Sequence, residues 1–319
     1  MLLRQKESFG LMDVATFKQL QQELFGLLSK DCENIQQGVY PLSVLKPESP
    51  VAHLMRLPRV LWDGVRIGMR RHRGRTTEFS AAAGELLDEL PRYYRRNFHF
   101  QSDGYLSEES AELYEHQVEI LFNGSADAMR RLIIAPLRER FGSGDGKGLT
   151  FLEIGAGTGR TTRFVSQAFP KARIIATDLS TPYIKVAGRR LSAGYPKVDF
   201  LQADGSHLPF QNGQFDAVYS VFLFHELPLE QRREILAESR RVLKDGGFFG
   251  FVDSIQKGDK PVFDTLLEDF PKSFHEPFYR NYIENSMEGL LEEQGFAAVR
   301  KDTGFFSKVA WAIRPSEKS

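Results

Sequence analysis

The pattern of apolar and polar residues changes near the middle of the chain. From about Gly144 onward, short apolar runs alternate with amphipathic, helix-like stretches. The runs that predict β-strands cover residues 149–155, 172–180, 198–204, 215–224, 246–254, 297–306 and 307–315. The first five are continuous apolar runs, as expected of parallel strands that helices bury on both faces. The last two leave no room for a crossover helix between them, so we expect an antiparallel hairpin. The pattern predicts an α/β fold with a seven-stranded, mostly parallel, doubly wound sheet.

The first 140 residues show helical periodicity instead. In one segment, apolar residues recur at helical spacing behind Asp13, a candidate N-cap. They are Val14, Phe17, Leu20, Leu24, Leu27 and Leu28. We expect this helix to bury one face against the rest of the chain or against a partner, which leaves a homodimer open.

A second helical segment, residues 56–75, is rich in arginine. Its arginines are Arg56, Arg59, Arg66, Arg70, Arg71, Arg73 and Arg75. We interpret this segment as a solvated helix face that leads into a loop. The alternative is a patch for an anionic surface or substrate.

A glycine-rich stretch, residues 142–148, separates the helical run 125–141 from the first strand. We divide the chain into an N-terminal helical region, residues 1–124, and an α/β domain, residues 125–319. The helical region is expected to form a substrate pocket, a lid or an oligomer contact.

Composition narrows the classes of function. The 319 residues contain 42 Lys and Arg and 42 Asp and Glu, so the formal net charge is zero and no nucleic-acid partner is expected. The single cysteine, Cys32, excludes an intramolecular disulfide framework and zinc sites built from several thiolates. We therefore expect a reducing, cytoplasmic location and predict no metal site. No stretch approaches the ~20 apolar residues that span a bilayer, so we expect no stable membrane insertion, with peripheral contact left open.

The first predicted strand runs into a glycine-rich turn, "FLEIGAGTGRTT", residues 151–162. Such a turn can receive a nucleotide, or it can be only a tight strand-to-helix connection. The dinucleotide pattern G-x-G-x-x-G does not fit, because Arg160 or Thr162 stands where the third glycine is needed. Instead, an acid precedes alternating glycines: Glu153, Gly155, Gly157 and Gly159.

Two more carboxylates follow the next two strands. Asp178 ends the second predicted strand, where a carboxylate can accept hydrogen bonds from both hydroxyls of a ribose. Asp204 ends the third, where it can accept a hydrogen bond from an adenine amino group while the Gly205 N–H serves a ring nitrogen. These positions predict a nucleoside site at the carboxyl edge of the sheet.

The turn resembles motif I of class I S-adenosylmethionine-dependent methyltransferases. The chain is also similar to the branch that contains the ubiquinone and menaquinone C-methyltransferases, the type 11 methyltransferase domain. The residues at that branch's spacing are Leu208, Pro209, Phe210, Phe215, Asp216, Leu243, Lys244, Asp245 and Gly246. The resemblance covers roughly residues 130–315.

This resemblance implies a Rossmann-like fold and S-adenosyl-L-methionine as the cofactor. Three carboxylates suit a sulfonium ion that carries an ammonium group better than they suit a pyrophosphate. The implied cofactor-binding residues are Glu153, Gly155, Ala156, Gly157, Thr158, Gly159, Asp178, Leu179, Asp204, Gly205 and Ser220. The implied activity is methyl transfer to a small organic acceptor of aromatic, quinone-like or lipid-like character.

His225 is the candidate catalytic residue. It follows the fourth predicted strand, and it could exchange a proton at neutral pH if the acceptor must lose one. The alternative is a histidine that orders its loop or packs against substrate. Two aromatic insertions, residues 91–110 and 273–286, are expected to build the acceptor pocket. The predicted pocket residues are His99, Tyr105, His225, Glu226, His275, Tyr279 and Tyr282.

Two other classes of function stay open. One is a macromolecule-directed methyltransferase, although the Asp/Asn-Pro-Pro-aromatic turn of amino-methylating DNA enzymes is absent at residues 220–223. The other is a non-catalytic protein that keeps the fold as a binding module. Such a module has no physical need for all of Glu153, Asp178 and Asp204.

Overall fold

The computed structural model describes residues 14–46 and 50–316, so the candidate N-cap Asp13 lies outside the described residues. The sheet consists of β1 (Thr150–Ile154), β2 (Arg173–Asp178), β3 (Val198–Gln202), β4 (Phe215–Val221), β5 (Leu243–Ser254), β6 (Ala297–Gly304) and β7 (Ser307–Ile313). The strand order is β3-β2-β1-β4-β5-β7-β6. Pairs among β1 to β5 are parallel, and β7 runs antiparallel to both β5 and β6. The predicted fold is confirmed.

The fourth strand is shorter than its apolar run predicts. The prediction of a strand through residue 224 is wrong, because β4 ends at Val221. Phe222 has a φ of 57°, in the left-handed region, so the backbone leaves the strand there. The chain then forms a 3₁₀ turn, η6 (Phe224–Glu226). This turn brings His225 and Glu226 back over the carboxyl edge of the sheet.

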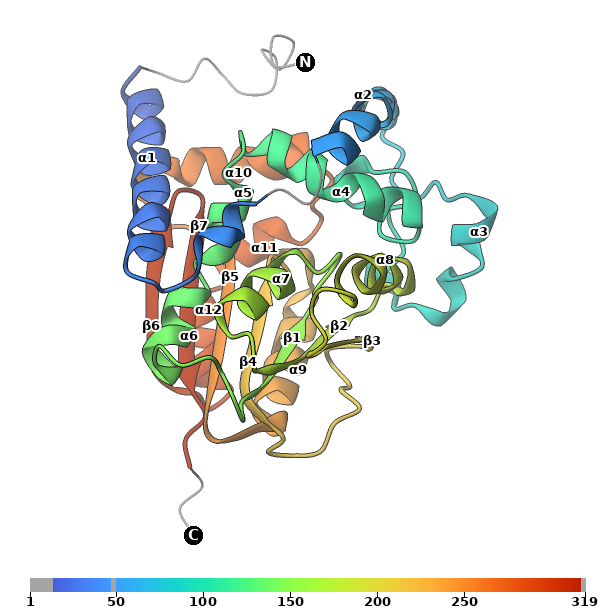
Figure 1. Ribbon diagram of the computed structural model, residues 1–319. Coiled ribbons are helices and arrows are strands. Elements are labelled where there is room, and N and C mark those ends of the chain that lie inside the picture. Colours follow the sequence, from blue (N-terminus) through green and yellow to red (C-terminus); the bar gives the residue numbers. More distant parts are fainter. Residues whose placement is uncertain (1–13, 47–49, 317–319) are drawn as a thin grey trace.

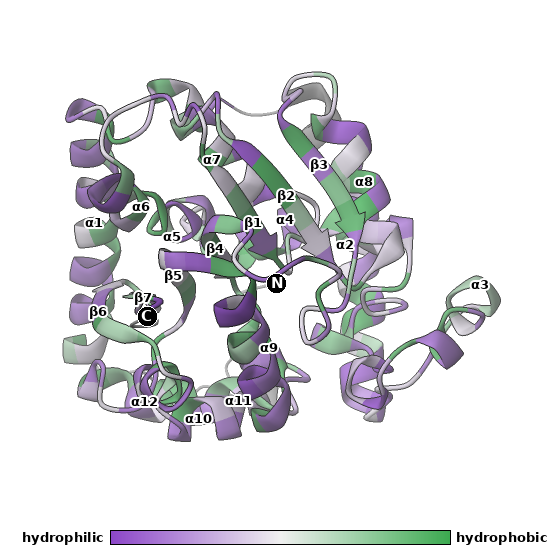
Figure 2. Ribbon diagram, turned by 90° about the horizontal axis from the view of Figure 1, so that it is seen from below, coloured by the Kyte–Doolittle hydropathy of each residue, from purple (hydrophilic) through white to green (hydrophobic). Residues whose placement is uncertain are grey.

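Helices cover both faces of the sheet (Figure 2). On one face lie α5 (Ala126–Arg131), α6 (Ile134–Phe141) and α7 (Arg160–Ala168). On the other lie α9 (Leu229–Val242), α10 (Asp264–Ser273), α11 (Tyr279–Glu284) and α12 (Met287–Glu293), preceded by the short turn η7 (Pro261–Phe263). α8 (Thr181–Leu191) packs beside β3 and β2. Each face closes around its own apolar cluster, which explains the continuous apolar runs of β1 and β4.

The single helical run predicted over residues 125–141 is two helices. α5 ends at Arg131 and α6 begins at Ile134. Pro136 accounts for the break, because it lacks an N–H and its ring would clash with the carbonyl group of Leu132 in one continuous helix.

The region before residue 125 is helical, as expected. Its elements are α1 (Val14–Gln36), η2 (Leu42–Leu45), α2 (Pro50–Arg73), α3 (Ala81–Gly84), η3 (Leu87–Glu89), η4 (Arg92–Tyr94), η5 (Phe98–Phe100) and α4 (Glu108–Leu121). In Figure 1, α1 stands beside β6, whereas α2, α3 and α4 gather on the other side of the molecule near α8. α4 packs on both α2 and α8. None of the helices within the described ranges is long and apolar enough to cross a bilayer.

The apolar stripe predicted for α1 is buried only in part. Leu27 is 2% exposed and belongs to the main apolar cluster, whereas Val14 and Phe17 are 70% and 49% exposed. Leu20 and Leu24 are partly exposed and pack against the same cluster. The C-terminal half of the helix therefore makes most of its contact with the sheet domain.

A buried ion pair fastens α1 to α5. Both oxygens of Asp31 accept hydrogen bonds from the Arg131 guanidinium, at 2.8 and 2.6 Å. The Tyr40 hydroxyl donates a third bond to Asp31, at 2.6 Å. The Arg131 guanidinium also lies 5.0 Å from the centre of the Phe164 ring. Removing one partner would leave a buried charge without its counterion, which is costly in the low-dielectric interior.

We predict that Asp31→Ala lowers the free energy of unfolding by about 3–5 kcal/mol, because Arg131 would lose its buried partner. Urea denaturation followed by circular dichroism measures this change. The control is Lys30→Ala, which breaks an exposed pair with Asp302 and should change stability by less than about 1 kcal/mol. Equal effects of the two substitutions would contradict the prediction.

Candidate functional site

The glycine turn between β1 and α7 packs closely on one side and is open on the other. Gly155, Gly157 and Gly159 all have positive φ, which favours glycine. At Gly159, a Cβ would lie 2.6 Å from Leu191 Cδ1 of α8. At Gly157, the nearest atom to such a Cβ is Tyr183 Cδ1 at 4.0 Å. The turn therefore touches α8 closely at Gly159 and leaves free space at Gly157.

Glu153 supports this turn from within the core. Its Oε2 accepts hydrogen bonds from Thr162 Oγ1 at 2.5 Å and from the Tyr219 hydroxyl at 3.0 Å. Burial raises the pKa of Glu153 to about 8, although both donors oppose the shift. These bonds join β1 to α7 and β4, so the side chain positions the turn as well as lining the space in front of it.

Asp178, at the end of β2, holds the turn directly. Its Oδ2 accepts a hydrogen bond from the Gly157 N–H at 2.7 Å, and its Oδ1 accepts one from the Ser180 N–H at 2.8 Å. Burial raises the pKa of Asp178 to about 6, and the Glu226 carboxylate adds to the rise while the N–H donors oppose it. Asp204, after β3, accepts hydrogen bonds from the N–H and the hydroxyl of Ser206 at 2.9 and 2.7 Å.

These residues surround one cavity at the carboxyl edge of the sheet, which opens to solvent; its empty space, with the open solvent included, is about 970 Å³. The predicted cofactor-binding residues that line it are Glu153, Gly155, Ala156, Gly157, Thr158, Asp178, Leu179, Asp204 and Gly205. Two others are not among its lining residues. Gly159 packs against α8, and Ser220 Oγ donates to the Ile154 carbonyl at 2.8 Å, which joins β4 to β1.

The lining carries more acidic than basic side chains. Its carboxylates are Glu115, Glu153, Asp178, Asp204 and Glu226, and its guanidinium groups are Arg130 and Arg160. A cavity with this excess of carboxylates favours a cationic ligand over a pyrophosphate.

Two charged lining residues distant from the glycine turn in sequence, Glu115 and Arg130, were not predicted, and neither was Arg160, which follows the turn directly. Glu115, in α4, accepts a hydrogen bond from Thr158 Oγ1 of the glycine turn. Arg130, in α5, lies with its Nη2 3.5 Å from Glu115 Oε2. No local pattern marks either residue, because both reach the cavity only when α4 and α5 pack beside the turn.

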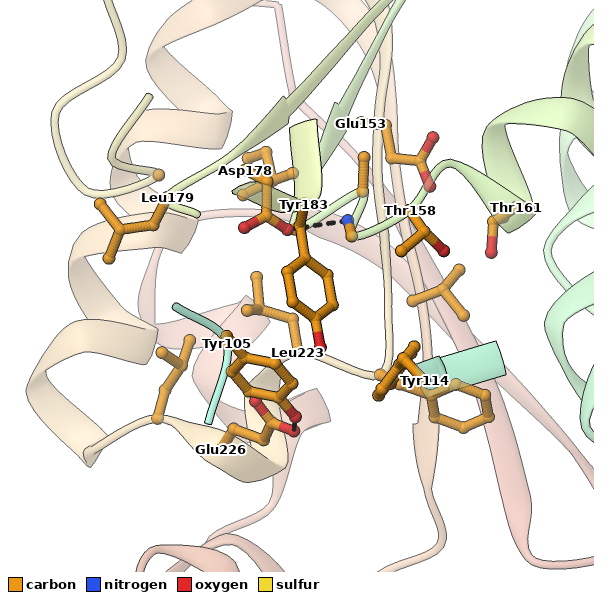
Figure 3. A pocket seen from close by; sticks show the side chains of 18 of the residues that line it. Tyr105, Tyr114, Glu153, Thr158, Thr161, Asp178, Leu179, Tyr183, Leu223 and Glu226 are labelled. Atoms are coloured by element: carbon orange, nitrogen blue, oxygen red, sulfur yellow. Dashed lines mark hydrogen bonds between the residues drawn. The ribbon is translucent and has the colours of Figure 1, made fainter. Parts of the chain in front are cut away.

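Aromatic rings form another wall of the cavity, below the glycine turn in Figure 3. The ring of Tyr183 lies 5.3 Å from that of Tyr105 and 5.8 Å from that of Tyr114, measured between centroids. Tyr94 and Phe98 pack against Tyr105 and also line the space. Except for Tyr183, these rings come from residues 94–114, so the N-terminal region completes the cavity that the sheet begins.

His225 is held behind this cavity rather than in its lining. Its Nδ1 lies 2.6 Å from Asp253 Oδ1, and its Nε2 lies 3.9 Å from Glu226 Oε1. Burial alone lowers the pKa of His225, but the Asp253 carboxylate outweighs this effect and raises the pKa to about 9. The rings of Tyr279 and Tyr282 pack edge-on against the imidazole. The catalytic role of His225 stays a prediction.

His99 joins two glutamates at the aromatic end of the cavity. Its Nε2 lies 3.2 Å from Glu226 Oε1, and its Nδ1 lies 2.8 Å from Glu276 Oε1. The Tyr105 hydroxyl donates to the same Glu226 oxygen at 2.5 Å. Burial alone lowers the pKa of His99, but the two carboxylates outweigh it and raise the pKa to about 10.

The structure therefore brings the predicted pocket residues His99, Tyr105 and Glu226 together. The predicted pocket residues Tyr279 and Tyr282 instead pack behind His225, and both bond to Ser254. His275 packs against Phe100, 5.6 Å between ring centroids. Glu276, its neighbour, was not predicted, although the second aromatic insertion contains it.

Comparison with known proteins identifies related chains. The methyltransferase domain family matches residues 151–247, which span β1 to the start of β5. An uncharacterised methyltransferase of Synechocystis sp. is 30% identical over 154 residues, 48% of this chain and 69% of that protein. The demethylmenaquinone methyltransferase of Thermotoga maritima is 28% identical over 166 residues, 48% of this chain and 69% of that protein.

A third relative is named for a lipid acceptor. The fatty-acid O-methyltransferase of Mycolicibacterium smegmatis is 32% identical over 148 residues, 46% of this chain and 52% of that protein. The chain thus spans about half the length of that protein.

Proposed function

The chain belongs to the family of S-adenosylmethionine-dependent methyltransferases, and on this premise we propose that it transfers a methyl group to a small lipid-like or quinone-like acceptor. The observation that carries the proposal is the shared cavity. Its glycine turn and acids form one end, and its tyrosine wall forms the other. A cofactor and an apolar acceptor can therefore meet inside one enclosure.

The residues present suit the cofactor. Asp178 and Asp204 would hold the ribose and the adenine, and the open space at Gly157 admits the body of the molecule. Glu115 and Arg130 lie where opposite charges can receive the amino and carboxylate groups of the methionine part. S-adenosylmethionine, when bound, supplies a methyl group already activated by a positive sulfur. The protein has mainly to align the acceptor and exclude water.

The tyrosine wall supports an apolar or aromatic acceptor. Tyr94, Phe98, Tyr105 and Tyr114 present ring faces and edges to the cavity, and Tyr105 adds a hydroxyl that can orient a polar group. Two relatives are named for a fatty acid and for demethylmenaquinone, which agrees with such a lining. We further propose that residues 93–115 act as the lid of this pocket, because they cover the cofactor side and the acceptor side together.

We also propose that α2 rests on an anionic membrane surface, from which an apolar acceptor enters. The exposed apolar side chains of this helix are Met55, Leu57, Leu61, Trp62, Val65 and Met69. Arg59, Arg66 and Arg73 are exposed too, and their spacing of seven residues aligns them along the same side of the helix. Apolar and basic side chains together characterise helices that lie in a lipid interface. α2 packs on η5, the turn that carries His99.

We predict that cofactor affinity depends on the charge of Asp178. Because its pKa is raised to about 6, the free protein binds a proton there below pH 6, and that proton must leave before the ribose hydroxyls can donate to the carboxylate. Affinity for S-adenosylhomocysteine should be full above pH 6 and fall by about tenfold per pH unit below it. Calorimetry between pH 5 and pH 8 measures this dependence.

Matched variants distinguish the titration of Asp178 from the titration of neighbouring groups. The titratable groups around it include Glu153, Tyr93, Tyr94, Tyr183 and Glu226. Asp178→Asn should weaken S-adenosylhomocysteine binding at pH 8 and remove the pH dependence of the affinity. Asp204→Asn should also weaken binding, but the pH dependence should remain. A pH dependence that survives in Asp178→Asn would assign the titration to another group.

The activity is tested with radiolabelled S-adenosylmethionine and three acceptors: a demethylmenaquinone analogue, a long-chain fatty acid and glycine. We expect label to enter the quinone or the fatty acid and not glycine. His225→Asn should lower turnover while leaving affinity for S-adenosylhomocysteine unchanged. The proposed acceptor class would be overturned if label entered only glycine, or only a protein or an RNA supplied as the acceptor. Absence of any S-adenosylhomocysteine binding would overturn the activity itself.

The membrane proposal is tested by sedimentation with vesicles that contain phosphatidylserine. The double variant Arg59→Glu, Arg66→Glu should bind at least about 30-fold more weakly than the unmodified protein, since each basic residue near an anionic surface contributes ~1 kcal/mol and each new carboxylate is repelled. The control is Arg173→Glu, an exposed arginine at the opposite end of the strands, which should bind normally. Absence of vesicle binding by the unmodified protein at low salt would remove the proposal.

A further inference from the structure

We propose that His99, Glu226 and Glu276 form a binding site for one divalent metal cation at the acceptor end of the cavity. The three residues come from separate parts of the chain: η5 of the N-terminal region, η6 after β4, and the loop between α10 and α11. Each can offer one ligand atom, and these atoms all lie within 4.8 Å of one another.

Glu276 is the residue that most needs a partner. Its side chain is fully buried, its Oε1 faces His99 Nδ1, and its Oε2 has no hydrogen-bond partner among the residues that the structure describes. Its ion-pair contact is the one with His99 Nδ1 at 2.8 Å. A buried carboxylate ordinarily accepts several hydrogen bonds or binds a cation, because burial strips its charge of water. A metal ion would satisfy this carboxylate, and its binding would release the proton that His99 otherwise holds between the two glutamates.

The spacing of the ligand atoms suits such an ion. Metal–ligand bonds of ~2.1 Å place neighbouring ligand atoms of an octahedral ion about 3 Å apart. His99 Nδ1 lies 2.8 Å from Glu276 Oε1, close to that value, whereas Glu226 Oε1 lies 3.2 Å from the other ring nitrogen, Nε2. One ion would bind one of these nitrogens, and with one atom from each residue the ligand atoms lie within 4.8 Å of one another. One imidazole with two carboxylates favours Mn²⁺, Fe²⁺ or Zn²⁺, because imidazole suits transition metals and carboxylates suit harder cations. Three protein ligands leave coordination positions open for another molecule.

Neighbouring residues hold one of the ligands, Glu226, in place. The Tyr105 hydroxyl donates to Glu226 Oε1 at 2.5 Å, which orients that carboxylate. Asp253 accepts hydrogen bonds from the N–H groups of Phe224 and His225 at 2.8 and 3.3 Å and so fixes the turn that carries Glu226. Such outer contacts are typical of metal centres, where they orient the ligands.

The role of the metal rests on the proposed function. Glu226 and Tyr105 line the cavity, so an acceptor oxygen that enters along the tyrosine wall would meet the open coordination positions. A hydroxyl bound there would lose its proton to solvent more readily, because the cation stabilises the oxygen anion that remains. The acceptor would then be positioned and activated by the same ion.

Metal binding is tested directly with the whole chain. The protein is freed of metal with a chelator and titrated with Mn²⁺, and free Mn²⁺ is measured by electron paramagnetic resonance. We expect one Mn²⁺ per chain. Glu276→Gln and Glu226→Gln should each weaken binding by about 100-fold, since each removes a charged ligand. The control is Glu115→Gln, a carboxylate of the same cavity outside the proposed site, which should bind Mn²⁺ as tightly as the unmodified protein.

Folding and cofactor binding are measured in parallel. Because Glu276 is buried, His99→Asn serves as a second variant at a less buried position, and circular dichroism checks that each variant is folded. S-adenosylhomocysteine affinity should be unchanged in His99→Asn, so loss of metal binding is distinguishable from loss of the proposed activity. The proposed site would be overturned if the unmodified protein bound neither Mn²⁺ nor Zn²⁺. It would also be overturned if the folded variants at His99, Glu226 and Glu276 bound the metal as tightly as the unmodified protein.

Discussion

The hydrogen bond between Asp178 and the Gly157 N–H is the contact on which the cavity depends. It joins the end of β2 to the turn after β1 and thereby fixes where α7 begins. This glycine turn also places Thr158 against Glu115 of α4. That contact helps to set the position of the N-terminal region over the sheet. Because Asp178 is half-buried, these N–H donors help to stabilise its charge, and a bound ribose would supply further donors to the same carboxylate.

The excess of buried carboxylates is the second constraint. Acids converge on one space from β1, β2, the loop after β3, η6 and α4, and the basic groups beside them are Arg130, Arg160 and, next to Glu226, His99. Such an arrangement is unfavourable where the acids are removed from water without enough cations beside them. The proposed sulfonium cofactor at the glycine turn and the proposed divalent cation beside His99 would each relieve part of it. Both proposals thus explain the same feature at opposite ends of one cavity.

Local sequence patterns were sufficient to locate the strands, because most of them are buried on both faces along their length. The apolar runs located every strand, with ends within three residues of those observed, because strands buried on both faces leave a continuous signature. They failed at Phe222, since a left-handed residue inside an apolar run gives no local signal. Glu115 and Glu276 were missed for a related reason: each lies in an ordinary-looking segment and gains its role from side chains distant in sequence.

The sequence alone determined the sheet, the glycine turn and the acids at Glu153, Asp178 and Asp204, because strand periodicity and turn chemistry are set by residues next to one another. Only the tertiary structure decided which side chains meet across the cavity. It set His225 against Asp253, placed Glu115 on the turn, and brought His99 to Glu226 across 127 residues of chain. Those meetings follow from the packing of the N-terminal region on the carboxyl edge of the sheet, a contact between distant segments that no local pattern encodes.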